Sequence, residues 1–359
     1  MARRLTIVAI TLLVCAGLLR ADTATPFFME LQPTEMLPRA VGGNGWVSVG
    51  ALMNGGGFYW MPNTGKVELG GTSGAAISRD GQTIVGNALD AQGRENAAIW
   101  IGGRNWQLLG SFSKEAVPCD RDYSSAYGTS ADAKVIVGLA WDGCRLARAF
   151  RWEESTGVVS LGSLTGRSTR ANNISGDSHT IVGWEEHATG FRMGAKWVDS
   201  EEQLITGSSG GPVGEAFAVN RDGTLISGTN CTAGVASPTP TGWVWKSGSG
   251  LQCFPVERPS WLRPLPYSVL MQAMSDDGLV IGGAYSFGLD SEALIWLDGQ
   301  VYFLRDYLRS NGLPDAFRGW INTGFITAVT PDGRTLVGYG AGPTGFQGYM
   351  VVLPDRGKR

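Results

Sequence analysis

The sequence predicts an all-β protein: a seven-bladed β-propeller of four-stranded antiparallel blades, closed by its N-terminal strand. Three observations predict this fold. A hairpin motif recurs seven times, a strand ending in tryptophan follows most copies, and the last repeat lacks one strand. Glycine and tryptophan are abundant, with 53 and 13 residues, and aromatic strands punctuated by glycine are typical of all-β proteins. The best candidate for a helix is the short stretch Phe303–Gly312.

The recurring motif is clearest in AISRDGQTIVG, at Ala76–Gly86. A strand of small residues leads into an Asp-Gly turn, and an apolar β-branched strand leaves it, which is the pattern of a β-hairpin. Each copy ends in a glycine, and these glycines are Gly50, Gly86, Gly138, Gly183, Gly228, Gly283 and Gly338. Their spacings of 36, 52, 45, 45, 55 and 55 residues are close to the repeat of about 40–50 residues that propeller blades show.

A second hairpin follows most copies of the first. Its leading strand ends in a tryptophan, and these residues are Trp60, Trp100, Trp152, Trp197, Trp245 and Trp296. Recurrence in six repeats indicates a structural role, in which each ring fills space between blades. The last repeat has a third strand near Phe346–Leu353 but no fourth, whereas a spare apolar strand, Phe27–Leu31, precedes the first repeat. We therefore expect Phe27–Leu31 to complete the seventh blade and cover its open edge.

The hairpin motif, followed by RAFRW (Arg148–Trp152) and VVSLGSL (Val158–Leu164), resembles the HAF-repeat family of bacterial extracellular proteins. The resemblance extends over essentially the whole mature chain and is most specific in the second to fourth repeats. The histidine of the family's His-Ala-Phe triplet is replaced here by Arg148. The resemblance implies a propeller fold and export, and it implies no particular catalytic activity.

The first 24 residues have the layout of a secretory signal peptide. They contain a basic start, an apolar run and small residues for cleavage, which are Arg3 and Arg4, Leu5–Leu19, and Ala21 and Ala24. The apolar run is short for a membrane span, which needs about 20 residues, and no second run of that length follows. We expect residues 1–24 to be a signal peptide and residues 25–359 to form one propeller domain, monomeric and secreted or periplasmic.

The charge of the chain argues against nucleic acid as a partner. The whole sequence has 29 Lys+Arg and 32 Asp+Glu, and loss of Arg3, Arg4 and Arg20 with the signal peptide leaves 26 against 32, a net charge of −6. Phosphate binding requires a basic surface instead. No metal and no cofactor is expected, because His179 and His187 are two unpaired histidines in separate loops.

Four cysteines remain after the signal peptide, an even number that suggests two disulfides in an oxidising compartment. Four cysteines permit three pairings. We predict Cys119–Cys144 and Cys231–Cys253, because each of these pairs brackets one blade and would tie a long loop to its neighbour.

The long insertions all fall on one face of the predicted propeller. They are Ser111–Ser125, Thr229–Thr241, Phe254–Ser268 and Arg305–Thr323. Each connects the second and third strands of a blade or joins two blades, and such connections share one face, here called the long-loop face. The short Asp-Gly turns lie on the opposite face, here called the turn face. Long loops on a rigid scaffold are where function concentrates.

The long-loop face also carries aromatic residues beside charged ones, a combination that suits a polar organic ligand such as a glycan or a peptide. The candidate ligand-binding residues are Tyr123, Trp141, Trp184, Trp261, Trp320, Asp122 and Arg318. The alternative is that these aromatic rings only hold the loops in place.

Two functions remain open. The preferred one is a secreted, non-enzymatic binding or scaffold propeller with an unidentified extracellular ligand. The alternative is a propeller hydrolase or lyase that acts on extracellular polysaccharide. A glycosidase would need two convergent carboxylates about 5–10 Å apart. The acids that could supply them are Asp120, Asp122, Glu185, Glu186, Glu257 and Asp315, and the sequence selects no catalytic pair among them.

Overall fold

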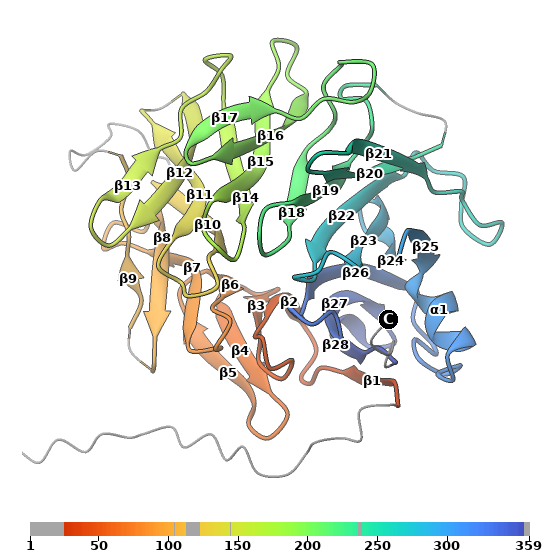
Figure 1. Cartoon of the computed structure of the whole chain (residues 1–359). Coiled ribbons are helices and arrows are strands. Elements are labelled where there is room, and N and C mark those ends of the chain that lie inside the picture. Colours follow the sequence, from red (N-terminus) through yellow and green to blue (C-terminus); the bar gives the residue numbers. More distant parts are fainter. Residues whose placement is uncertain (1–24, 104, 113–122, 144, 236–238, 355–359) are drawn as a thin grey trace, which may run out of the picture.

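Seven four-stranded antiparallel sheets surround a common centre in the computed structural model, which describes residues 25–103, 105–112, 123–143, 145–235 and 239–354 (Figure 1). The predicted seven-bladed propeller is therefore confirmed. The predicted signal peptide, residues 1–24, lies outside the described residues. In the described part of the chain, no helix is long and apolar enough to cross a membrane.

Each blade takes four strands in the order of the chain, except the last. Blade 1 contains β2 (Met36–Val41), β3 (Ser48–Leu52), β4 (Gly57–Met61) and β5 (Gly65–Gly70). Blade 2 contains β6 (Ser73–Ile77), β7 (Thr83–Leu89), β8 (Glu95–Ile101) and β9 (Gln107–Leu108). Blade 3 contains β10 (Ser124–Thr129), β11 (Ile136–Asp142), β12 (Leu146–Glu153) and β13 (Gly157–Ser160). Blade 4 contains β14 (Thr169–Ile174), β15 (Thr180–Glu186), β16 (Arg192–Val198) and β17 (Glu201–Leu204). Blade 5 contains β18 (Ala216–Val219), β19 (Leu225–Thr229), β20 (Thr241–Lys246) and β21 (Gly250–Pro255). Blade 6 contains β22 (Ser268–Met274), β23 (Val280–Phe287), β24 (Asp290–Leu297) and β25 (Gln300–Phe303).

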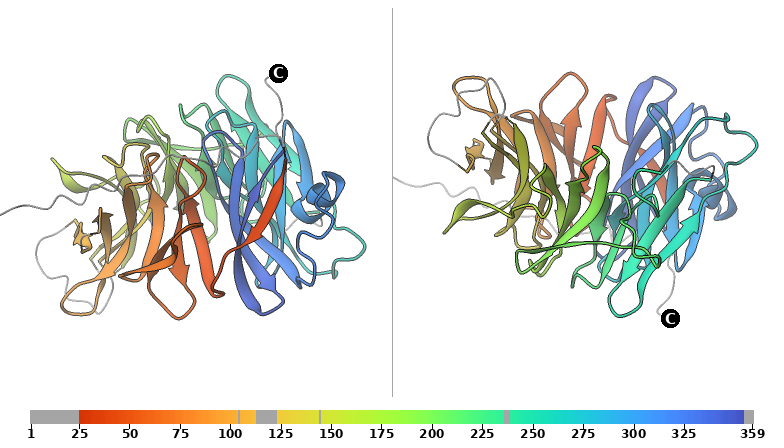
Figure 2. Two further views of the ribbon diagram at one scale, coloured as in Figure 1. Left: turned by 90° about the horizontal axis from the view of Figure 1, so that it is seen from below. Right: turned by 90° about the horizontal axis from the view of Figure 1, so that it is seen from above.

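The seventh blade closes the ring with a strand from the other end of the chain. It consists of β26 (Asn322–Val329), β27 (Thr335–Gly342), β28 (Gly345–Val352) and, on its outer edge, β1 (Phe27–Glu30). Strand β1 pairs antiparallel with β28, and the Leu31 N–H extends the pairing by donating to the Gly348 carbonyl at 2.8 Å. Figure 2 shows β1, in red, alongside the blue strands of this blade. The predicted closure by Phe27–Leu31 is confirmed, and it leaves the two ends of the described chain in one sheet.

The helix α1 (Leu304–Ser310) follows β25 within the predicted stretch Phe303–Gly312. It lies at the outer edge of the ring, beside β25 (Figure 1). Leu304 and Leu308 are buried in a core cluster shared with blades 6 and 7. The helix therefore covers the side of the propeller and forms the first part of the insertion Arg305–Thr323.

The first hairpin of most blades is closed by a hydroxyl and an aspartate. In blade 3 the Ser130 hydroxyl donates to Asp132 Oδ1 at 2.8 Å and accepts the Val135 N–H at 3.1 Å, while Asp132 Oδ1 accepts the Lys134 N–H. The same hydroxyl–aspartate bond recurs at Ser78, Ser175, Ser275 and Thr330. The recurring Asp-Gly motif of the sequence is therefore a turn with a built-in hydrogen-bond network, in agreement with the simple turn chemistry of these residues.

The glycine that ends each motif stands opposite a β-bulge in the first strand of its blade. Gly138 pairs with Ala126, where the register of β10 shifts by one residue. A Cβ added to Gly138 would lie 2.0 Å from the Ser125 carbonyl oxygen. At the other six glycines, an added Cβ would lie 1.8 to 2.4 Å from the equivalent carbonyl oxygen. These glycines are Gly50, Gly86, Gly183, Gly228, Gly283 and Gly338. Only glycine fits at this repeated close approach.

The repeat tryptophans also occupy equivalent places. Five of them pair with the isoleucine of the preceding hairpin, as Ile84–Trp100, Ile136–Trp152, Ile181–Trp197, Ile226–Trp245 and Ile281–Trp296. Trp60 and Trp197 are buried and the other four are partly exposed. Trp245 contacts Lys196 of the neighbouring blade, with the ammonium 4.0 Å from the ring centroid. Their packing supports the structural role expected from their recurrence.

We expect Gly138→Ala to lower the free energy of unfolding by about 3 kcal/mol or more, because the new methyl group would overlap a backbone oxygen that cannot move independently of its sheet. Gly211→Ala is the matched control: it has ordinary contacts and should change stability by less than about 1 kcal/mol. Urea unfolding followed by tryptophan fluorescence measures both. Equal effects of the two substitutions would contradict the steric role of Gly138.

Candidate functional site

The turn face is tied together around the propeller axis. Backbone hydrogen bonds join the turn tips of neighbouring blades, from Gly43 to Arg79, Arg79 to Ala131, Asp177 to Arg221 and Asp276 to Pro331. In addition, Arg79 of blade 2 forms a 2.6 Å ion pair with Asp276 of blade 6, although these blades are not adjacent. Two side chains therefore span the axis at this face. Its short, mutually bonded connections leave the long-loop face as the one with room for a binding site.

Two aromatic residues predicted to be available on the long-loop face are buried, which corrects that expectation. Trp320 is 5 % exposed, and its indole N–H donates to Glu30 Oε1 at 2.9 Å. Its ring packs at the edges of Phe28 and Phe317 in the closing blade. Trp184 is also buried, because the Arg192 guanidinium covers its ring. Both residues are held inside by neighbours that are distant in sequence or lie on another strand.

The other predicted residues are spread over the face. Trp261 is 51 % exposed and contacts the edge of Phe303. Tyr123 and Trp141 are partly exposed, and the Arg94 guanidinium lies 4.2 Å from the Tyr123 ring centroid. Arg318 is exposed and lies 3.5 Å from Asp315. Asp122 lies outside the described residues. The structure therefore does not gather these residues into one site.

We expect Trp320→Ala to lower the free energy of unfolding by about 3–5 kcal/mol, because it would leave a cavity in the closing blade and remove a partner from Glu30. Trp261→Ala, in an exposed loop, should change it by about 1 kcal/mol or less. Denaturant unfolding of the two variants side by side tests the difference. A stable Trp320→Ala variant would show that the ring is not part of the core.

A pocket of about 470 Å³ lies on the long-loop face between blades 4 and 5. Parts of three connections surround it: residues 187–191 between β15 and β16, residues 205–215 between β17 and β18, and residues 230–235 after β19. The side chains that matter most for its chemistry are Phe191, Arg192, Glu215, Thr229, Asn230 and Val235. Its volume is in the range of small-molecule sites, about 300–1,000 Å³.

A buried carboxylate organises one wall of this pocket. Glu215 Oε1 accepts hydrogen bonds from Arg170 and from the Asn172 amide at 2.5 and 2.8 Å, and Oε2 accepts from Arg192 at 3.0 Å. Arg170 and Asn172 belong to β14, the first strand of blade 4, whereas Glu215 comes just before β18 of blade 5. The cluster therefore fixes the two blades relative to each other at the pocket.

Two aromatic rings hold the arginines of this cluster in place. The Arg192 guanidinium lies 4.5 Å and that of Arg170 5.5 Å from the Trp184 ring centroid. Arg170 also lies 4.8 Å from the ring centroid of Tyr127 in blade 3. A guanidinium over an aromatic face is attracted by the ring quadrupole. Trp184, predicted as a ligand-binding residue, is instead placed to support Arg192.

Thr229 supplies the pocket with a polar group that has no protein partner. The residue is 7 % exposed, and its hydroxyl forms no hydrogen bond within the described part of the chain. Buried hydroxyl groups are usually bonded, and each exception requires an explanation. The oxygen itself is shielded from solvent, so a ligand in the pocket would reach it only if the Thr229 side chain turned.

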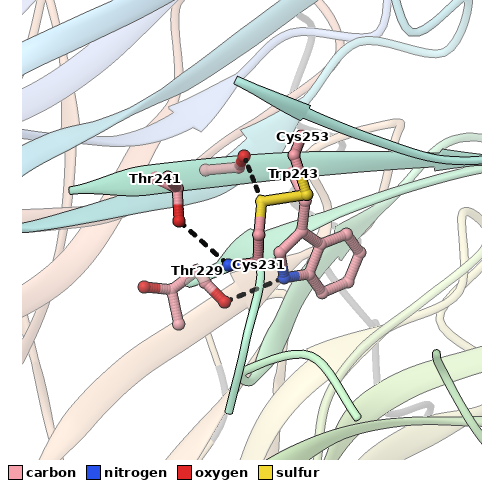
Figure 3. Close-up of a disulfide and its surroundings, with 6 residues drawn as sticks. Thr229, Cys231, Thr241, Trp243 and Cys253 are labelled. Atoms are coloured by element: carbon pink, nitrogen blue, oxygen red, sulfur yellow. Dashed lines mark hydrogen bonds between the residues drawn. A yellow bond between two sulfur atoms is a disulfide. The ribbon is translucent and has the colours of Figure 1, made fainter. Parts of the chain in front are cut away.

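The predicted disulfide Cys231–Cys253 is present and anchors one side of the pocket (Figure 3). Cys231 lies two residues after the end of β19, and Cys253 lies on β21, so the bond ties the start of the pocket loop to the outer strand of blade 5. The Trp243 indole N–H donates to the Thr229 carbonyl at 2.8 Å beneath the same loop. The other predicted pair, Cys119–Cys144, lies outside the described residues.

Sequence reasoning missed the residues of the charged cluster, although the repeats contain a signal for them. In every blade the carbonyl group opposite the repeat glycine belongs to the residue at the same position of the repeat. From blade 1 to blade 7 these residues are Leu37, Ser73, Ser125, Arg170, Glu215, Leu270 and Phe325. Only blades 4 and 5 have a charge there. A departure from the repeat at two neighbouring blades marks the place where a site could form.

Of the acids proposed for a hydrolytic pair, those that the structure describes do not line the pocket. Asp120 and Asp122 lie outside the described residues, Glu257 is exposed, and Asp315 is beside Arg318. Glu186 is partly exposed at the end of β15, whereas Glu185 is buried and accepts hydrogen bonds from the Ser163 hydroxyl and the Thr165 N–H. Its close carboxyl neighbour is Glu202 of β17.

Glu185 and Glu202 form a shielded pair with opposite proton affinities. Burial and the neighbouring Glu185 raise the pKa of Glu202 from its ordinary value of 4.5 to about 8. Burial also raises the pKa of Glu185, but the hydrogen bonds from Ser163 and Thr165 outweigh it and leave that pKa lowered. At neutral pH the pair therefore holds one proton, on Glu202, and carries one negative charge.

This pair makes stability depend on pH. Unfolded Glu202 loses its proton near pH 4.5, whereas folded Glu202 keeps it up to about pH 8. The contribution of Glu202 to the free energy of unfolding is therefore largest below about pH 4.5. It falls as the pH rises toward 8 and stays constant at higher pH. We expect Glu202→Gln to flatten the decline between pH 5 and 8, measured by urea unfolding at several pH values. Glu201→Gln, an exposed neighbour, is the control, and an unchanged slope in Glu202→Gln would rule out the raised pKa.

Comparisons with known proteins support the fold alone. No protein-family model matches the sequence, and no curated protein matches it. The structure is similar to an oligogalacturonate lyase in complex with manganese, with a TM-score of 0.57 and 12 % identity over 91 % of this chain and 93 % of that one. It is also similar to the oligogalacturonate lyase of Vibrio parahaemolyticus (TM-score 0.54, 12 % identity, 93 % and 98 %) and to the WD40 repeats of RRP9 (0.54, 12 %, 91 % and 97 %). The class defined here is thus a seven-bladed propeller, shared by proteins with unrelated descriptions.

Proposed function

We propose that this chain is an extracytoplasmic, non-enzymatic binding propeller that takes a glycan or a peptide at its long-loop face. The observation that carries the proposal is the pocket between blades 4 and 5, with its buried charged cluster and the unpartnered Thr229 hydroxyl. The tips of the turn face are bonded to one another instead, and Arg79 and Asp276 pair across its axis.

The location outside the cytoplasm is supported by the disulfide and by the sequence. Disulfides persist in oxidising compartments and are rare in the cytosol. Cys231–Cys253 closes a segment with a sequence separation of 22 residues and holds the pocket loop in place. The signal-peptide pattern of residues 1–24 and the resemblance to the HAF-repeat family agree with this location.

Binding fits the pocket better than catalysis does. Both oxygens of Glu215 already accept hydrogen bonds from positively charged or amide groups, so this carboxylate is not poised to take a proton from a substrate. The shielded Glu185–Glu202 pair resembles an acid–base couple, because its two carboxyl groups have opposite proton affinities. Glu185 Oε2 and both carboxyl oxygens of Glu202 are nevertheless buried away from solvent. A carboxylate that is held in place between two arginines favours recognition of a ligand.

The test begins with glycan and peptide arrays, followed by two substitutions. Val235 is an exposed residue of the pocket wall, and Val235→Trp should cover the pocket and weaken binding of an array hit about tenfold or more, a loss of about 1.4 kcal/mol. Leu279→Trp is the matched control, because Leu279 is also an exposed aliphatic residue but lies on the turn face. Isothermal titration calorimetry measures the affinities.

Two results would overturn the proposal. One is that Leu279→Trp loses binding whereas Val235→Trp keeps it, which would place the ligand on the turn face. The other is turnover: a screen of polysaccharide hydrolysis and elimination that detects products from the purified chain would establish the enzymatic alternative.

A further inference from the structure

We infer that the pocket between blades 4 and 5 recognises the carboxylate of an acidic saccharide, and that Arg192 is the residue that binds it. The inference rests on the proposed function, because it names the ligand of the same pocket.

The first step is the balance of charge around Glu215. This buried carboxylate is bonded to two guanidinium groups, those of Arg170 and Arg192, so the three residues together carry one positive charge in excess. Arg170 is largely buried, and its Nε also donates to the side-chain amide oxygen of Asn172. The Arg192 side chain is 50 % exposed and lines the pocket. The unbalanced positive charge therefore faces the place where a ligand would sit.

The second step is the orientation of Arg192. Its Nη1 donates to Glu215, and within the described residues neither Nε nor Nη2 has an acceptor. The Trp184 ring, 4.5 Å away, keeps the guanidinium plane in position. A planar carboxylate pairs with two such N–H groups at once, which makes the contact both strong and selective for shape.

The third step is the nature of the remaining groups. The Asn230 side chain lines the pocket and forms no hydrogen bond within the described part of the chain, so its amide oxygen and amide N–H groups can bind hydroxyl groups of a ligand. A free amino acid would bring an ammonium group, yet Glu215 has no oxygen without a partner to receive it. Hydroxyl-binding groups beside an arginine favour a sugar acid over an amino acid or the end of a peptide.

One neighbour works against anion binding and provides a second test. Glu186 is the direct cross-strand partner of Arg192 in the β15–β16 register, and it forms no ion pair with that arginine. Its negative charge is close enough to oppose an incoming carboxylate. Removing this charge should therefore strengthen binding of an acidic saccharide.

The experiment compares short uronate oligosaccharides with their methyl esters on the full mature chain, using calorimetry at low and at physiological salt. The ester has the same size and hydroxyl groups but no charge. We expect the acid to bind at least about tenfold more tightly than the ester. The advantage should shrink as salt is added, because the contact is partly exposed. This comparison needs no variant and so does not depend on the folding of one.

Three variants then test the assignment to Arg192. Arg192→Gln should abolish the preference for the acid, and Glu186→Gln should strengthen binding of the acid. Arg263→Gln, which removes an exposed arginine of the insertion Phe254–Ser268 on the same face but outside the pocket, should leave the affinity unchanged. Thermal unfolding of each variant, checked against the wild type, shows whether the fold is retained.

The outcomes separate this inference from the proposed function. Equal affinities for acid and ester, or an unchanged preference in Arg192→Gln, would overturn the inference, and the proposed function would still stand if Val235→Trp blocks an array hit. Binding of carboxyl-terminal peptides in place of uronates would overturn the assignment to a saccharide. Absence of binding to any array member or uronate would overturn both.

Discussion

The first two strands of every blade approach each other so closely, at one point, that no side chain fits between them. At that point the first strand bulges, and the facing residue of the second strand is a glycine whose added Cβ would lie 1.8 to 2.4 Å from a carbonyl oxygen. The bulge bends the inner strand, and the glycine lets the next strand follow the bend. Because the same contact occurs in all seven sheets, it sets the shape from which blade packing, loop positions and the pocket follow.

Ring closure turns seven similar sheets into a molecule with two different faces. Strand β1 seals the seventh blade, and Glu30 at its end accepts hydrogen bonds from Trp320 and from the Gln347 amide. The turn tips bond to one another around the axis, and the ion pair between Arg79 and Asp276 spans it. Such a face is rigid and has little variable surface. Insertions are tolerated on the opposite face, where loops can differ without disturbing the ring.

The candidate site arises where the repeat is broken. Arg170 and Glu215 occupy the position that is uncharged in the other five blades, and as neighbours they pair across the blade interface. Arg192 and Trp184 complete the cluster from the second and third strands of blade 4. The disulfide then fixes the loop that forms the other wall. Symmetry provides the frame, and departures from it in two adjacent blades provide the chemistry.

The sequence by itself determined the number of blades and the closing strand, because these follow from repeat spacing and local turn chemistry, and it also indicated the short helix. It left three pairings of four cysteines possible, and the structure confirmed the predicted pair Cys231–Cys253. Only the tertiary structure decided which aromatic residues are available. Trp320 and Trp184 lie in the segments of the long-loop face, like Trp261, yet contacts with Glu30 and Arg192 bury them. It also decided that Arg170, Arg192 and Glu215 meet, since the contact joins strands of two blades. Local patterns fix the repeating unit, whereas burial and charge pairing depend on how units pack against one another.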